Sequence, residues 1–302
     1  MKSLGILNNI YLCGIIQGEM DIKIDKIEND FEGYNELINF YALNKEKKFS
    51  EINLKLTGWF SAHTCSMLGA ILTKLQNKLN SVNIDALKAK DILERNGFLS
   101  FFGNEKKIDY NNTTIPYQVL SIDDDRYFNN YVFKEFLGKS DLPNMTEGLK
   151  KKMTESIYEI FINAKIHSQT DKIFICGQYF PYLHKIEFML TDIGVGIKNV
   201  INTRFNSNLT AIQAIDWAIE DRNTTKNGIS GGIGLALLYE FIQKNMGKIQ
   251  IVSNEGFWEL NTEGIIKSSF ENEFPGTMIN IMVRTDDKNS YMLYDEIPED
   301  IF

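Results

Sequence analysis

The chain has 302 residues, of which 43% are hydrophobic and 24% charged, and a formal net charge of -8. These values are typical of a globular protein with one large or two smaller domains. They argue against nonspecific nucleic-acid binding, and no apolar run is long enough to span a bilayer. The three cysteines have neither a metal-binding spacing nor the pattern of a disulfide framework, so we expect a cytoplasmic protein.

The first predicted element lies in the apolar segment 4–16. It follows Lys2, as the core of a secretion signal would, but Asn8 and Asn9 interrupt it and no small-residue cleavage site follows. We therefore expect a first strand or a buried hairpin here.

Residues 20–135 are predicted to form a small α/β domain of strand–helix–strand–helix order. Strands are expected over 52–57 and 82–86, and helices over 62–79 and 90–96.

A further helix over 126–137 is predicted to pack between two domains, with a loop around Pro143 after it. We therefore divide the chain into a first domain, 1–138, and a second, 139–286. The acidic remainder, 287–302, is predicted to be a solvated tail.

Residues 153–167 have the apolar spacing of an amphipathic helix. Glu155, Glu159 and Asn163 follow one another one turn apart on another face of that helix. A carboxylate there can take a proton from water or a hydroxyl, and an amide oxygen suits Mg²⁺. An ordinary solvated helix face has the same composition.

A strand over 186–190 is predicted to lead into Asp192-Ile-Gly194-Val-Gly196. The two glycines let the backbone approach a ligand closely, and the carboxylate can accept a hydrogen bond from an exocyclic amine. A plain turn is the alternative interpretation. The dinucleotide-binding fingerprint and the P-loop signature are both missing from the sequence.

A glycine-rich motif, Gly231-Gly232-Ile-Gly234, opens into an apolar helical run over 235–245. Free N–H groups at such a helix start favour an anion.

The segment before this motif, 197–230, is predicted to hold one helix, over 211–219, and then a polar loop that closes over phosphates. Lys226 and Arg222 are the cations placed to meet them, unless they are ordinary surface charges.

Strands are predicted over 247–253 and 276–283, and the second begins at Gly276-Thr277, whose hydroxyl can bond a nucleobase edge. Taken in order, these segments describe a site for a base at one end and a metal-bound triphosphate at the other. ATP binding with Mg²⁺ is therefore predicted.

Residues 145–285 resemble the ATP-binding domain shared by DNA gyrase, Hsp90 chaperones, histidine kinases and MutL, the GHKL superfamily. The resemblance implies an α+β chain whose second domain is a Bergerat-type two-layer sandwich, a mixed sheet with helices on one face. It implies that Asp192 binds the adenine amino group, assisted by Thr277, while Gly194 and Gly196 shape that end of the site.

At the phosphate end, the resemblance implies that Asn163 coordinates Mg²⁺ and that Glu159 is the general base. It also implies that Gly232 and Gly234 lie against the phosphates beneath a lid. From the residues themselves, we add Gly231 of the same glycine-rich motif and Lys226 of the loop before it as nucleotide contacts.

Within the superfamily, Glu159-Ile-Phe-Ile-Asn163-Ala164-Lys-Ile-His167 is similar to the Glu-x-x-x-Asn-Ala-x-x-His pattern of anti-sigma-factor serine kinases. Histidine kinases usually carry a different residue at the position of Glu159. Met246-Gly247 departs from the Gly-Gly pair common after the final helix, which affects a turn more than the chemistry.

The first domain resembles STAS domains, the partners of those kinases. The resemblance places His63-Thr64 where the antagonists carry Asp-Ser with a phosphoacceptor serine, so Thr64 and the nearby Ser66 are candidate acceptors. A helix N-cap is the other interpretation of Thr64.

These patterns support three functions, led by an ATP-hydrolysing conformational switch in bacterial signalling or regulation. The second is a serine/threonine kinase of the anti-sigma type that acts on a partner or on its own STAS-like domain. The third is a noncatalytic, nucleotide-gated docking module. The expected partner is a protein or a second copy of the chain, with neither nucleic acid nor membrane.

Overall fold

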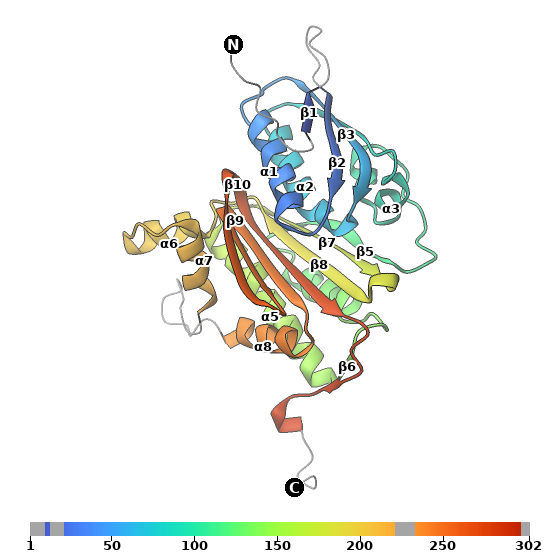
Figure 1. Ribbon diagram of the computed structural model, residues 1–302, viewed down its shortest axis with the longest axis vertical. Helices are drawn as coiled ribbons and strands as arrows, with labels where there is room; N and C mark the ends of the chain where they lie inside the picture. Colours follow the sequence, from blue (N-terminus) through green and yellow to red (C-terminus); the bar gives the residue numbers. More distant parts are fainter. Residues whose placement is uncertain (1–9, 13–20, 221–232, 297–302) are drawn as a thin grey trace.

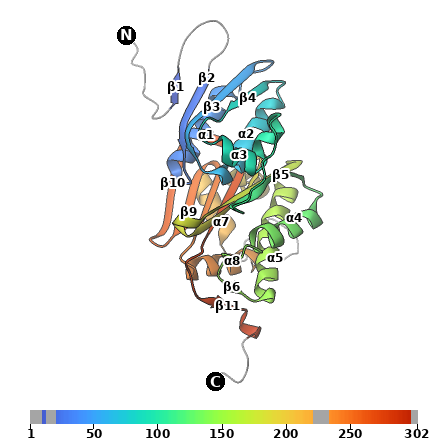
Figure 2. The same ribbon diagram turned by 90° about the vertical axis from the view of Figure 1, so that its right-hand side faces the viewer.

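The computed structural model describes residues 10–12, 21–220 and 233–296. Helices and sheets alternate in layers, and both sheets are flanked by helices (Figures 1 and 2). Among the described residues, no helix combines the length and apolar character that crossing a bilayer requires.

The N-terminal sheet has the strand order β1-β2-β3-β4. Its strands are β1 (Ile10–Leu12), β2 (Asp21–Ile27), β3 (Glu51–Phe60) and β4 (Ser81–Asp85). β2, β3 and β4 are parallel, and β1 pairs antiparallel with β2. The predicted strand–helix–strand unit is confirmed, because α2 connects β3 to β4.

We call the N-terminal sheet and the helices that follow its strands the first unit. Its helices are α1 (Phe31–Asn44), α2 (Cys65–Gln76), which follows a 3-10 turn (Ala62–Thr64), and α3 (Lys90–Arg95). A 3-10 turn over Phe98–Phe102 follows α3. The helix α1 was not predicted. Its start is set by Asp30, whose carboxylate accepts from the Gly33 amide at 2.8 Å. Gly33 is required there, because a Cβ would lie 2.2 Å from the Glu28 carbonyl oxygen.

The central sheet has five strands in the order β5-β7-β8-β10-β9. They are β5 (Thr114–Ser121), β7 (Lys172–Phe180), β8 (Lys185–Asp192), β9 (Lys248–Asn261) and β10 (Gly264–Arg284). All of these pairings are antiparallel, so the expected mixed sheet is wrong. Short connections join β7 to β8 and β9 to β10, and such connections impose antiparallel pairing.

β5 pairs with β7, so residues 114–121 belong to the central sheet although our division of the chain placed them in the first domain. The helix α4 (Asp125–Tyr131) and the π-helical turn after it (Val132–Phe136) follow β5. They pack against α5 and not between two domains, because Phe128 stacks on Phe161 of α5 with ring centroids 4.5 Å apart.

Helices cover both faces of the central sheet. On one face lie α5 (Glu147–His167), α7 (Ala211–Ile219) and α8 (Ile233–Lys244), with α6 (Ile197–Phe205) beside α7. On the other face, α1 and α2 share a continuous apolar core with sheet residues such as Phe174 and Met189. The expected single layer of helices therefore describes only half of the arrangement.

The predicted solvated tail is wrong for its first part. A short strand, β11 (Ser290–Tyr291), pairs with β6 (Asn144–Met145), and a 3-10 turn follows (Tyr294–Glu296). The Asp287 carboxylate accepts from the Asn245 amide at 2.8 Å, and Glu296 accepts from the Thr146 hydroxyl at the start of α5. These contacts attach the segment to the residue that follows α8 and to the N-cap of α5.

Candidate functional site

The helix α5 places Glu159 and Asn163 at the margin between core and surface. Both side chains are half-buried, while Phe161 between them is fully buried in the core below the sheet. Glu155, one turn earlier, is exposed and pairs with Lys152 at 2.7 Å. The two predicted residues therefore differ from Glu155, which lies on the solvated face.

Asp192 stands at the end of β8, with only 4% of its surface exposed. Its carboxylate accepts from the Gly194 amide at 2.7 Å and also from the amide of Thr277. Burial raises the pKa of Asp192 to about 7, against the opposing effect of these donors and of Lys74. A carboxylate has about four lone-pair positions, so acceptor capacity remains for an exocyclic amine.

Thr277 lies directly opposite Asp192 in the β8–β10 ladder, which confirms that the two are adjacent. Its hydroxyl oxygen is 3.0 Å from that of Ser253, and the Ser253 hydroxyl accepts from the Ile197 amide at 2.8 Å. Sequence reasoning missed Ser253, because a serine inside a strand carries no signal until the register is known.

The loop after β8 is fastened to the end of α5. Ser168 caps that helix, and its carbonyl accepts from the Val195 amide at 2.9 Å. Gly194 is required by this approach, because a Cβ would lie 2.1 Å from the Ser168 carbonyl oxygen. Gly196 has φ of 80°, and a Cβ there would lie 2.3 Å from the Asn254 side chain. The two glycines were predicted to let the backbone approach a ligand, and the close approach seen here is to protein atoms.

At the other end of the predicted site, Gly234 lies in the first turn of α8, which begins close to where the sequence indicated. Lys226, Arg222, Gly231 and Gly232 lie outside the described residues. The helix itself packs in the same core as α5, through Leu238, Phe241 and Ile242.

The candidate phosphoacceptors are both fully buried. Thr64 occupies the N-cap position of α2, as the second interpretation expected, but its hydroxyl donates to the Ser61 carbonyl oxygen at 2.6 Å and makes no capping hydrogen bond. The Ser66 hydroxyl lies 2.8 Å from the Phe174 carbonyl oxygen and 2.7 Å from the Thr191 hydroxyl. Both side chains therefore pack inside the molecule, and Ser66 bonds directly to the central sheet.

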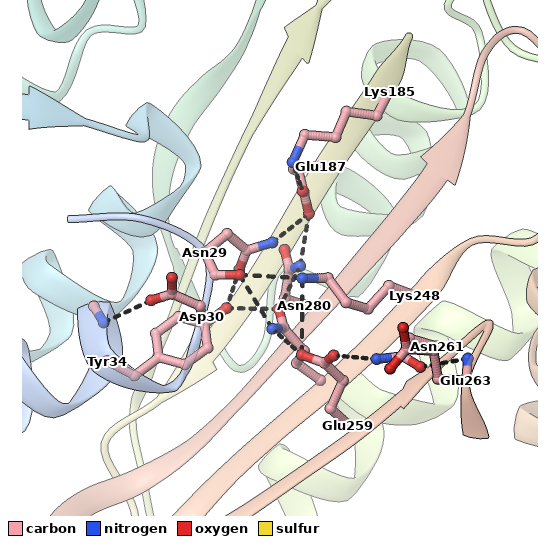
Figure 3. A network of polar contacts seen from close by, with 12 residues as sticks. Asn29, Asp30, Tyr34, Lys185, Glu187, Lys248, Glu259, Asn261, Glu263 and Asn280 are labelled. Carbon is pink, nitrogen blue, oxygen red and sulfur yellow. Dashed lines mark hydrogen bonds and ion pairs between the residues drawn. The ribbon is translucent and has the colours of Figure 1, made fainter. Parts of the chain in front are cut away.

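A second polar cluster lies at the other end of β8, where Glu187 is fully buried (Figure 3). Its carboxylate accepts from Lys185 at 2.8 Å, from Asn29 at 2.7 Å and from Asn280 at 2.8 Å. Asn29 immediately precedes the N-cap of α1, so this cluster joins the first unit to the sheet. The sequence offered no signal for it.

The charge of Glu187 is well compensated. Burial raises its pKa, but His63, Lys185 and Lys248 and the Asn280 amide outweigh burial, so the pKa lies below its ordinary value. Burial lowers the pKa of His63 to about 4, so this ring is neutral near pH 7 and the compensating charge there comes from the two lysines. This cluster therefore links the first unit to the central sheet inside the molecule.

Comparison of the sequence with protein-family models finds no matching family, and a search of curated proteins finds no match.

Proposed function

We propose that the chain binds Mg-ATP through a Bergerat-type fold built on the central sheet with α5, α7 and α8, and hydrolyses the nucleotide as a conformational switch. The observation that carries this proposal is Asp192, a buried carboxylate at a strand end, held by the amides of Gly194 and Thr277. Leaving such a group in a nearly dry environment costs free energy, as its raised pKa records. An amine donor from adenine would offset that cost.

The hydroxyls of Thr277 and Ser253 support the same assignment, because they lie next to Asp192 and can bond the edge of a base. Asp192 and Thr277 would then define adenine, with Gly194 and Gly196 setting the path of the backbone.

At the phosphate end, Glu159 would take a proton from the attacking water and Asn163 would hold Mg²⁺ through its amide oxygen. Bound Mg²⁺ would neutralise charge on the phosphate oxygens. An amide oxygen is a suitable ligand for this hard cation, which keeps several waters and takes its remaining ligands from phosphate. The link from Ser168 to Val195 supports the proposal, because it fastens the helix carrying both side chains to the loop behind Asp192.

A switch is favoured over a kinase acting on its own first domain. Thr64 and Ser66 are fully buried and hydrogen-bonded, and phosphoryl transfer requires an exposed hydroxyl in line with the phosphate. The parallel β2–β3–β4 arrangement is compatible with a STAS-like unit that docks a protein partner.

The test uses Glu159→Ala, with Glu155→Ala as the matched control one turn away on the same helix. The variants are incubated with γ-labelled ATP and Mg²⁺, and both free phosphate and label on protein are followed. We expect Glu159→Ala to bind ATP and to lose phosphate release by about 10²–10⁴-fold, the usual contribution of a general base. Glu155→Ala should resemble the wild type, because it loses only an exposed ion pair.

Phosphate release at the wild-type rate in Glu159→Ala would remove the base assignment. Label that accumulates on protein would instead indicate a kinase. ATP binding with neither product would indicate a docking module.

A further inference from the structure

The helix α2 contacts β8 on the face of the sheet opposite α5, and it touches both neighbours of Asp192. The Ser66 hydroxyl lies 2.7 Å from that of Thr191, and the Lys74 ammonium donates to the Ile193 carbonyl oxygen at 3.2 Å. Successive strand residues point to opposite faces. Thr191 therefore faces α2 in the first unit, while Asp192 faces the layer that contains α5, as Leu190 does.

The contact made by Lys74 continues directly to Asp192. The Ile193 carbonyl and the Gly194 N–H belong to one planar peptide group and point in opposite directions. Lys74 bonds to the carbonyl on one side, and Asp192 accepts from the N–H on the other side at 2.7 Å. Hydrogen bonds in such a chain polarise one another, so the ammonium strengthens the bond that holds the carboxylate.

Among the described residues, few charged side chains act on Lys74 and Asp192. Burial lowers the pKa of the half-buried Lys74, Asp192 opposes that effect, and Lys78 adds to it. Within the described part of the chain, Lys74 is the charged side chain whose field acts on Asp192, and it favours the carboxylate form. The ammonium thus partly offsets the cost of burying that charge.

We propose that Lys74 is a positioning residue of the nucleotide site, acting from the opposite face of the sheet by holding the Ile193–Gly194 peptide and placing a positive charge behind Asp192. This inference rests on the proposed function, because it assigns Lys74 to the base end of that site. The carboxylate is the form that accepts an amine N–H, so Lys74 favours the state that binds adenine. Occupancy of the site then depends on α2, and through it on the first unit.

The experiment measures ATP affinity by calorimetry at pH values on both sides of about 7, the pKa of Asp192. The variants are Lys74→Met, which keeps the length and loses the charge, and Lys74→Arg, which keeps the charge. Lys78→Met is the matched control, because Lys78 bonds to the Lys45 carbonyl and not to the β8 loop. Thermal unfolding of each variant reports whether the fold is retained.

We expect Lys74→Met to weaken ATP binding by about threefold to tenfold near neutral pH, since one pKa unit corresponds to about tenfold. The pH at which affinity is half lost should rise. Lys74→Arg should restore both, and Lys78→Met should change neither.

Wild-type affinity and an unchanged pH profile in Lys74→Met would overturn the inference. So would an affinity loss that is uniform across pH and not restored by Lys74→Arg, because packing alone would explain it. Failure of the wild type to bind ATP would overturn the proposed function itself, and it is seen before any variant is tested.

Discussion

The two ends of β8 each bury a carboxylate, and the surroundings of the two are opposite. Glu187 accepts hydrogen bonds from three side chains, and neighbouring lysines hold its pKa below the ordinary value. Asp192 accepts from backbone amides, and burial raises its pKa to about 7. One carboxylate has its charge fully compensated by the protein, and the other does not.

The difference separates a structural group from a candidate binding group. Groups of strongly shifted pKa that the fold leaves incompletely compensated tend to occur at functional sites. Glu187 joins α1 to the central sheet through Asn29 and can be explained by that joint alone. Among the described residues, Asp192 bonds to the amides of Gly194 and Thr277 and joins no two elements in the way Glu187 does, which is why we propose a ligand as a further donor.

Removing the Glu187 carboxylate should give the largest change in the free energy of unfolding. Glu187→Ala removes the acceptor of Lys185 and Asn29 and leaves Asn280 with the Gln250 side-chain oxygen alone. Removing one partner from a buried charged cluster costs about 3–5 kcal/mol. We expect this loss in the free energy of unfolding measured with urea. Glu187→Gln is the control, because it keeps one acceptor oxygen and should lose less. A loss below about 1 kcal/mol would show that the cluster does not hold the two units together.

Replacing Asp192, the buried carboxylate at the other end of β8, should weaken nucleotide binding and not stability. Asp192→Asn removes the cost of a buried charge, so the free energy of unfolding at pH 8 should stay the same or rise. ATP affinity should fall by roughly 10–100-fold, the value of a hydrogen bond to a charged group, while any GTP binding changes little. Calorimetry with both nucleotides provides the measurement. Equal losses for ATP and GTP would remove Asp192 from the adenine role.

The pH dependence of stability should have opposite signs for the two carboxyls. Asp192 has its pKa raised in the folded state, so its contribution is fully present below about pH 4 and is lost as the pH rises through about 7. Glu187 has its pKa lowered, so its contribution is present above its unfolded pKa and is lost as the pH falls through the folded pKa.

The measurement compares urea unfolding of the wild type with Asp192→Asn and with Glu187→Gln at several pH values. Each difference curve isolates one carboxyl, and the slope should be at most about 1.4 kcal/mol per pH unit. Slopes of the same sign would contradict the comparison between the two ends.

Sequence patterns alone located several elements of this fold. Helical spacing predicted α2, α5 and α7, and the strand leading to Asp192 was recognised from its β-forming residues. These signals are local, because helix periodicity and glycine before or after an element depend on neighbours in the chain. The adjacency of Asp192 and Thr277 was expected only through the resemblance to ATP-binding domains, and the strand register confirms it.

Other features depend on contacts between distant residues. The pairing of β5 with β7 moved a segment from the first domain into the central sheet, and no local signal marks which sheet a strand joins. Ser253 and Lys74 became part of the candidate site through register and helix packing.

The sequence by itself determined the residues of the candidate site on α5 and at the end of β8, because turn chemistry and helical periodicity are written in short segments. Only the tertiary structure decided that the first unit covers the second face of the central sheet, that Thr64 and Ser66 are buried beneath it, and that Lys74 reaches the peptide behind Asp192. Each of these follows from burying apolar surface between segments far apart in the chain, which selects one packing among many that the local patterns allow.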